Sequence, residues 1–214
     1  MLNFQEFFTA CIGRWTTERT YHSVLEAAVE RSYTEFQVEP ITEAQKQQIL
    51  SLCALNGVKV EGVNVKESEG VLPGFAIAFD TRSETGETVS MSLKALFVPD
   101  FYVVPTGAAS EMPSLPATAL VATEPKGEVI KGYYLRDEGY SEAGAIAGCF
   151  TYQPTRQTLE MTTYYRRSVA VDQMRIVSPD LRLRTIITYK RPTADEPPSV
   201  IELVGFGVER RQPA

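Results

Sequence analysis

The chain has little histidine, cysteine or tryptophan. His22 is the only histidine among 214 residues, so a multi-histidine metal site is excluded. Three cysteines, Cys11, Cys53 and Cys149, lie far apart and lack the CxxC spacing of zinc sites. Their number and spacing argue against a disulfide framework and suit a reducing compartment.

Long apolar runs and long basic runs are also missing. No apolar run reaches the roughly 18 residues of a membrane-spanning helix. The first residues, MLNFQEFF, lack the cationic and then apolar order of a secretory signal. Because the net charge is −6 and the pI is near 5.0, nucleic acid is not an expected partner. We expect a soluble intracellular protein with no membrane span.

Two helices are expected near the N-terminus. Asn3 with Glu6 three residues later resembles a capping box, and the apolar spacing that follows predicts a short helix closed by Gly13. Thr42 with Gln45 three residues later resembles a second capping box and predicts the start of a second helix. An Asn-Gly pair predicts its end.

The rest of the chain alternates with a period of two, which is typical of β-strands. The expected strands cover residues 13–22, 29–38, 58–66, 74–80, 88–98, 128–137, 145–152, 158–165, 168–177, 181–190 and 199–209. About ten evenly spaced antiparallel strands favour a mainly β fold, either a sandwich or a single up-and-down barrel over residues 1–214. Small barrels of this kind hold one ligand in their mouth.

A segment rich in Pro, Ala, Ser and Thr interrupts the strands at residues 99–127. A stretch of this length inside a compact domain is usually a lid or a flexible insertion. We expect one of these two here.

Residues 178–190, SPDLRLRTIITYK, place two arginines on an otherwise apolar strand. The proline and aspartate predict a turn, and the β-branched run predicts a strand with Arg182 and Arg184 on one face. If that face lines a cavity, two permanent cations require an acidic ligand there. If it faces water, the pair is a solvated edge.

Three stretches together resemble one family, the S/U-type phycobiliprotein lyases. Residues 13–22, GRWTTERTYH, resemble the family's first strand, GRWxSxRTxH, and contain the GxW of lipocalin-like barrels. Residues 131–150, KGYYLRDEGYSEAGAIAGCF, resemble its segment with an arginine, then Gly-Tyr, then Ala-Gly. Residues 178–185, SPDLRLRT, are similar to its SPNLRLRT. The resemblance covers the chain apart from the insertion.

The resemblance implies a lipocalin-like (calycin) barrel that binds an open-chain tetrapyrrole, or bilin, such as phycocyanobilin or phycoerythrobilin. It implies transfer of the bilin to a cysteine of an apo-phycobiliprotein subunit as a thioether. The bilin is the transferred ligand, and no metal or other cofactor is implied. The cytoplasm of a cyanobacterium or the stroma of a plastid is the implied location. A homodimer or a paralogous lyase subunit is a further implied partner.

The resemblance also implies site residues. The implied bilin-binding residues are Arg182, Arg184, Arg19, Trp15 and Tyr21, and the implied catalytic residues are Asp172 and His22. The two arginines of the SPDLRLRT stretch suit the two propionates of a bilin. Asp172 takes the place of a family glutamate that would stabilise a protonated chromophore, and His22 would hold a propionate or move a proton.

Each of these roles has a plainer alternative. Trp15 suits a plug in the barrel floor, and His22 or Asp172 suits a solvated strand face. Arg19 and His22 have opposite parity on the first strand, so a cavity receives both only if a bulge intervenes.

The chain also departs from the family pattern. Gln173 and Arg175 replace a family arginine and tryptophan, and Trp15 is the only tryptophan. These departures favour a non-catalytic partner subunit of a heteromeric lyase as an alternative to an autonomous enzyme. A third alternative is a lipocalin-like carrier of acidic hydrophobic ligands.

Overall fold

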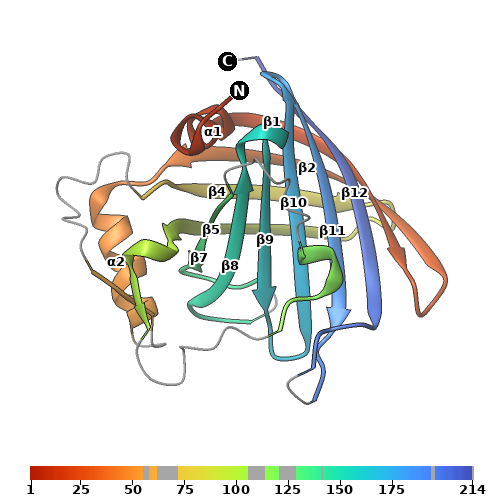
Figure 1. The fold of residues 1–214 in the computed structure, drawn as a ribbon. Coiled ribbons are helices and arrows are strands. Elements are labelled where there is room, and N and C mark those ends of the chain that lie inside the picture. Colours follow the sequence, from red (N-terminus) through yellow and green to blue (C-terminus); the bar gives the residue numbers. More distant parts are fainter. Residues whose placement is uncertain are drawn as a thin grey trace.

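Ten antiparallel strands close into a barrel in the computed structural model, which describes residues 1–54, 58–61, 72–105, 114–120, 129–140, 142–193 and 196–213. The strand order around the barrel is β1-β12-β11-β10-β9-β8-β7-β5-β4-β2, and β2 pairs with β1 to close it (Figure 1). The prediction of a mainly β up-and-down barrel with two helices is confirmed. Among the described residues, no helix is long and apolar enough to cross a membrane.

The described elements follow the expected order closely. They are α1 (Phe4–Cys11), β1 (Gly13–Ser23), β2 (Ala28–Pro40), α2 (Glu43–Ala54), β3 (Val58–Val60), β4 (Gly74–Ser83), β5 (Thr88–Pro99), η1 (Asp100–Tyr102), β6 (Val103–Pro105), η3 (Ala117–Ala119), β7 (Ile130–Arg136), β8 (Ile146–Gln153), η4 (Pro154–Arg156), β9 (Thr158–Tyr164), β10 (Ser168–Ser178), β11 (Leu181–Lys190) and β12 (Ile201–Arg211).

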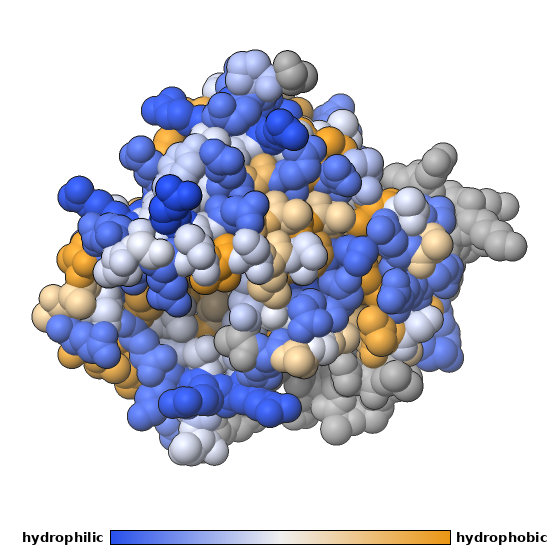
Figure 2. Space-filling model, turned by 180° about the vertical axis from the view of Figure 1, so that it is seen from behind, coloured by the Kyte–Doolittle hydropathy of each residue, from blue (hydrophilic) through white to orange (hydrophobic). Residues whose placement is uncertain are grey.

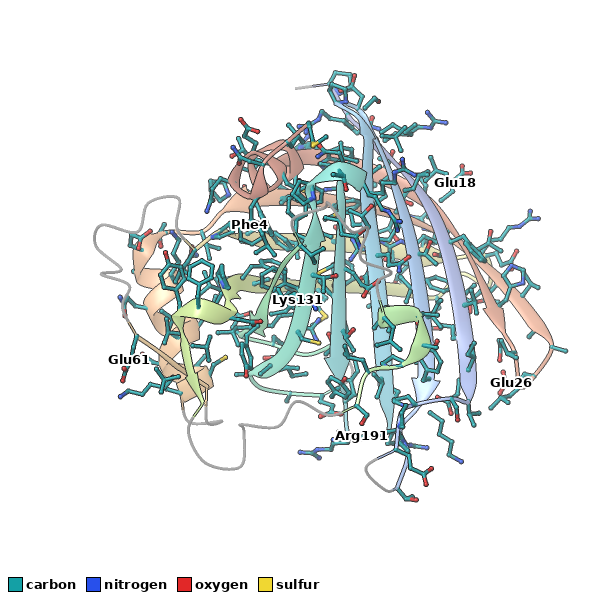
Figure 3. The ribbon with its side chains drawn as sticks, viewed as in Figure 1. Phe4, Glu18, Glu26, Glu61, Lys131 and Arg191 are labelled. Atoms are coloured by element: carbon teal, nitrogen blue, oxygen red, sulfur yellow. The ribbon has the colours of Figure 1, made fainter. Side chains whose placement is uncertain are left out.

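Helix α1 closes one end of the barrel. The Asn3 side chain accepts a hydrogen bond from the Glu6 backbone at 2.9 Å, and the Glu6 side chain accepts one from the Asn3 backbone at 2.8 Å, which completes the capping box. The apolar face of the helix then packs onto the barrel interior. Its buried side chains are Phe4, Phe7, Phe8 and Cys11. Figure 3 shows Phe4 beneath the helix, at the opposite end of the barrel from Glu26 at the tip of the β1–β2 hairpin. The interior is therefore closed at the α1 end.

Helix α2 lies outside the barrel. Thr42 and Gln45 cap its first turn, as the sequence predicts. The helix lies beside β5 and β7 (Figure 1). Its Ile49 and Cys53 are fully buried in one cluster with Leu96, Val98 and Leu135, on the outer faces of these strands. These two strands are therefore apolar on both faces, and the mouth of the barrel is left uncovered by α2.

The segment predicted as a flexible insertion is partly described. It contains η1, strand β6 and η3, and β6 pairs with β3 as a two-stranded sheet outside the barrel. Ala119 of η3 packs on Val169 and Val171, on the outer face of β10. Residues 106–113 and 121–127 of the segment, and most of the expected strand 58–66, lie outside the described residues.

Apolar and polar side chains separate as the period of two requires. The face drawn in Figure 2 is hydrophilic over most of its area, with apolar residues in small separate groups. Large aromatic side chains point inward from β4, β5, β7 and β8, and those of β4, β5 and β8 pack against the rings of α1. The closed end of the barrel is therefore lined with apolar and aromatic side chains where β4, β5 and β8 meet α1.

Candidate ligand-binding cavity

A cavity of about 420 Å³ lies inside the barrel, between the aromatic closed end and the opposite mouth. Its size falls within the range of small-molecule sites, and its wall is mostly apolar with a few convergent charges. The residues that line it are Arg19, Tyr21, Thr34, Phe36, Ile77, Phe79, Thr81, Val89, Tyr134, Arg136, Tyr140, Met161, Thr163, Tyr165, Ser168, Ala170, Asp172, Arg184, Ile186 and Thr188. A mixed wall of this kind suits a largely apolar ligand that carries negative charge.

Arg184 and Asp172 form a charged pair on the cavity wall. Arg184 Nε donates to Asp172 Oδ1 at 2.8 Å, and Nη2 donates to Oδ2 at 2.5 Å. The two residues lie on neighbouring strands β11 and β10, where Arg184 pairs with Met174 and Asp172 with Ile186. Two of the predicted site residues, Arg184 and Asp172, therefore lie together and are hydrogen-bonded to each other.

Arg182 lies deeper, in the barrel floor. It is 1% exposed, its Nη2 lies 2.8 Å from Glu209 Oε2, and its guanidinium lies 3.9 Å from the centre of the Trp15 ring. Trp15 is also 1% exposed and donates a hydrogen bond to the Cys11 carbonyl at 3.0 Å. Neither Arg182 nor Trp15 lines the cavity, so the reading of Trp15 as a floor plug fits its position.

Glu209 is the carboxylate at the centre of the floor. It is fully buried, and besides Arg182 it lies 3.5 Å from Arg184 Nη1 and 3.6 Å from Arg19 Nη2. Burial raises the pKa of the Glu209 carboxyl, but the three guanidiniums outweigh burial and hold that pKa below its ordinary value. Its place in the floor was not predicted from the sequence.

Arg19 and Tyr21 reach the cavity from β1, and Arg19 donates a hydrogen bond to the Tyr21 hydroxyl at 3.3 Å. They lie against the glycines of β12. A Cβ on Gly205 would lie 2.7 Å from the Tyr21 ring, and one on Gly207 would lie 3.1 Å from Arg19 Cγ. The alternating VGFGVER sequence of β12 thus leaves room for both side chains and places Glu209 below them.

His22 lies on the outer face of the barrel. It is exposed, and its ring lies 6.1 Å from that of Phe206, which is also exposed. No bulge interrupts the pairing of β1, so Arg19 points inward and His22 points outward. The structure therefore gives His22 no contact with the cavity, and any role for it belongs to the outer surface.

Arg136 on β7, the arginine of the KGYYLRDEGY stretch, lines the cavity but was not predicted as a site residue. It is 1% exposed, donates to the Tyr165 hydroxyl at 2.7 Å, and has the rings of Tyr134, Tyr140 and Tyr165 around it. The available signal was the alternation in KGYYLR, which puts Tyr134 and Arg136 on one face of the strand.

Burial disfavours the thiolate form of all three cysteines. Burial raises the pKa of the Cys53 thiol to about 12 and that of Cys149 to about 11, and it also raises the pKa of Cys11. Cys53 and Cys149 point away from the barrel interior, under α2 and toward the segment near η3. Among the described residues, no group of three potential metal ligands lies together.

The charges of the cavity and its floor do not balance. Arg19, Arg136, Arg182 and Arg184 contribute four positive charges, and Asp172 and Glu209 contribute two negative charges, so two positive charges remain among these described residues. Buried cations without counterions are costly, so the excess charge favours an anionic ligand in this cavity.

The fold is a lipocalin-like barrel, and its interior holds a cavity lined by several cationic side chains. The family model of the CpeS-like proteins matches residues 3–107 and 108–212. A relative from Synechococcus sp. (strain JA-3-3Ab), chromophore lyase CpcS/CpeS 1, is 39% identical over 208 residues, which cover 97% of this chain and 96% of the relative. The chain therefore belongs to the CpeS-like family, as the sequence resemblance predicts.

Two further proteins are similar to this chain. Chromophore lyase CpcS/CpeS 2 from Synechocystis sp. (strain ATCC 27184 / PCC 6803 / Kazusa) is 24% identical over 86% of this chain and 79% of the relative. The solved structure of the S-type phycobiliprotein lyase CPES from Guillardia theta superposes with a TM-score of 0.65, covering 100% of this chain and 94% of that chain, at 17% identity. That likeness supports the barrel fold.

Proposed function

We propose that this protein is a phycobiliprotein chromophore lyase, which binds a bilin in the barrel and promotes its attachment to a cysteine of an apo-phycobiliprotein. The observation that carries the proposal is the excess of two positive charges in the cavity and its floor. A bilin has two propionates and an otherwise largely apolar skeleton, so it supplies the missing charge and fits the apolar wall. The names of the family relatives support the reaction class.

Arg184 is the first propionate contact in this proposal. It lies at the cavity wall, whereas Arg182 is sealed beneath it by Trp15 and Glu209. Arg182 therefore acts on the ligand through the floor, by keeping Glu209 ionised and the position of Arg184 fixed. Arg19 and Tyr21 complete the polar side of the wall.

Binding at Arg184 requires an exchange of partners. Its fork is already occupied by Asp172 through two hydrogen bonds. When a ligand carboxylate takes over part of this fork, Asp172 loses charge-assisted bonds and is left beside the tetrapyrrole. A carboxylate in that position stabilises positive charge on the pyrrole nitrogens, which makes the chromophore more electrophilic.

The reaction itself is an addition. The acceptor thiol forms a C–S bond to the ethylidene side chain of ring A, its proton ends on the tetrapyrrole, and no group is lost. The raised pKa values of the protein's own cysteines argue against a covalent intermediate on this chain. The contribution of the protein is then orientation, electrostatics and exclusion of water.

A second candidate is a partner subunit that binds the bilin without transferring it alone. Its favouring observation is that the only tryptophan is in the floor, so no indole ring lines the cavity. Gln173 and Arg175 stand where the family pattern has an arginine and a tryptophan. Both lie on the outward face of β10 and do not line the cavity. The carrier alternative differs from both because it requires no acceptor.

The test is a transfer assay with purified protein, phycocyanobilin or phycoerythrobilin, and apo-phycobiliprotein subunits. Covalent product is detected by zinc-enhanced fluorescence after denaturing electrophoresis. Product above the level of spontaneous attachment supports the lyase. Bilin binding without product supports the partner subunit, and restoration of product by a paralogous lyase would identify the missing component. No binding of either bilin contradicts both readings.

A further inference from the structure

Arg136 is a buried cation without a carboxylate partner among the described residues. Its side chain points into the cavity from β7, and its only hydrogen bond to the described residues runs to a neutral group, the Tyr165 hydroxyl at 2.7 Å. Its Nε is buried and has no hydrogen-bond partner among the described residues. A guanidinium has five N–H donors, so most of its donor capacity is unused here.

The acidic groups near Arg136 are engaged elsewhere. Asp137, the next residue, points to the outer face and accepts from the Lys94 backbone at 2.7 Å and from Lys94 Nζ at 3.0 Å. Glu138 accepts from the Gly144 backbone at 3.0 Å. Asp172 is held by Arg184, so the pairing of these groups leaves the charge of Arg136 uncompensated.

Three tyrosines hold the guanidinium in place. Its central carbon lies 5.4 Å from the ring centre of Tyr134, 4.8 Å from that of Tyr140 and 5.7 Å from that of Tyr165. Tyr134 and Tyr165 are buried, whereas Tyr140 is 49% exposed and lies at the mouth side. Aromatic faces offset part of the cost of burying a cation but do not use its N–H groups. The arrangement fixes the fork while leaving donors for an incoming anion.

We propose that Arg136 and its three tyrosines form a second carboxylate-binding site, separate from the Arg184–Asp172 pair. β7 and β11 are separated by β8, β9 and β10 around the barrel, so the two cations stand on different walls of one cavity. A ligand with two carboxylates is then bound at two points, which fixes its orientation as well as its affinity. The identification of that ligand as a bilin rests on the proposed function, whereas the anion site itself does not.

This proposal predicts opposite effects on stability and on binding. If Arg136 serves the ligand, replacing it with methionine removes an uncompensated buried charge and keeps the volume of the side chain. Arg136→Met should then unfold at the same temperature as the wild type or higher, while losing affinity. A purely structural role, such as holding Tyr165, would lower the unfolding temperature and leave affinity in the folded protein unchanged.

The experiment compares the wild type, Arg136→Met, Arg136→Lys and the matched control Arg210→Met, whose arginine is exposed on the outer face of β12. Two probes are titrated into each: phycocyanobilin by absorbance, and 8-anilinonaphthalene-1-sulfonate, a small aromatic anion, by fluorescence. We expect Arg136→Met to bind phycocyanobilin at least about tenfold more weakly than the wild type, and the control to match the wild type. Arg136→Lys, which keeps the charge but lacks the fork, should fall between them.

Binding of both probes to Arg136→Met within about twofold of the wild type would overturn the site. If the wild type binds no phycocyanobilin, the proposed function fails. The Arg136 site is then tested by the sulfonate titration alone, and sulfonate binding to Arg136→Met within about twofold of the wild type overturns it. If Arg136→Met does not fold, Arg136→Lys decides, and wild-type affinity for both probes in that variant overturns the site.

Discussion

Arg184 and Asp172 hold each other across two neighbouring strands of the barrel, through two hydrogen bonds of 2.8 and 2.5 Å. Burial alone would lower the pKa of Arg184, but Asp172 and Glu209 outweigh it and raise that pKa well above its ordinary value. Arg184 is therefore always charged. Without a ligand, its charge is balanced by groups that the ligand must partly displace.

We predict that Asp172→Asn separates binding from transfer. The ligand carboxylate no longer competes with Asp172 for Arg184, so bilin affinity should equal or exceed that of the wild type. Transfer to the acceptor should fall by about tenfold or more, because the group that stabilises a protonated chromophore is lost. Absorbance titration and the transfer assay measure the two quantities on the same preparation. A large loss of affinity in Asp172→Asn would show that Asp172 binds the ligand instead of competing with it.

Arg184→Gln should weaken bilin binding by roughly 1.5–3 kcal/mol, the usual value of a hydrogen bond to a charged group. The barrel should still fold, because Glu209 keeps Arg182 and Arg19 as partners. Circular dichroism checks the fold and absorbance titration measures the affinity, with Arg210→Gln on the exposed outer face as control. Equal affinities of the two variants would remove Arg184 from the site.

Trp15→Phe should affect stability without affecting binding. The substitution removes the hydrogen bond to the Cys11 carbonyl and weakens the contact with Arg182, which together stabilise the floor by roughly 1–3 kcal/mol. Urea unfolding measures this loss. The bilin dissociation constant should change by less than about threefold, since Trp15 does not line the cavity. A much weaker complex with an intact fold would instead make Trp15 a chromophore contact.

Two buried glutamates should give opposite pH responses. The pKa of Glu209 is lowered in the native state, so its contribution to stability is complete above the ordinary glutamate value of 4.5 and is lost as the pH falls through the lowered pKa. Burial raises the pKa of Glu160, although the Gln173 side chain at 2.6 Å opposes this. Its native carboxyl binds a proton more tightly than the unfolded one, so its effect on stability becomes less favourable as the pH rises.

The measurement is urea unfolding of Glu209→Gln and Glu160→Gln at neutral pH and at about pH 4. At neutral pH, Glu209→Gln should lower the free energy of unfolding by about 3–5 kcal/mol, because it leaves buried arginines unpaired. Glu160→Gln should raise it. Each variant serves as the control for the other, since both remove one negative charge. A destabilised Glu160→Gln at neutral pH would mean that the ionised Glu160 is better compensated than its contacts indicate.

Much of the fold could be predicted from the sequence because strand alternation and helix caps are local signals. The period of two also predicted that Arg19 and His22 point to opposite sides, and the unbroken pairing of β1 bears this out. Strand β3 falls within the expected strand 58–66, but strand β6 and its pairing with β3 were not predicted, because β6 has three residues and the pairing joins residues distant in sequence.

The charge partners within the site could not be predicted. Asp172 and Glu209 are both candidates for any interior arginine, and only the register of β10, β11 and β12 assigns Asp172 to Arg184 and Glu209 to Arg182. Arg136 was missed for a related reason. Arg136 stands out because no carboxylate among the described residues is paired with it. A sequence pattern cannot show that a charge partner is missing.

The most direct measurement is a titration of the wild-type protein with phycocyanobilin and, in parallel, with its dimethyl ester, which has the same chromophore without the carboxylates. If the cavity arginines bind the propionates, the free acid binds at least about tenfold more tightly than the ester. Equal affinities, or no binding of the free acid, would contradict a bilin site built on these arginines.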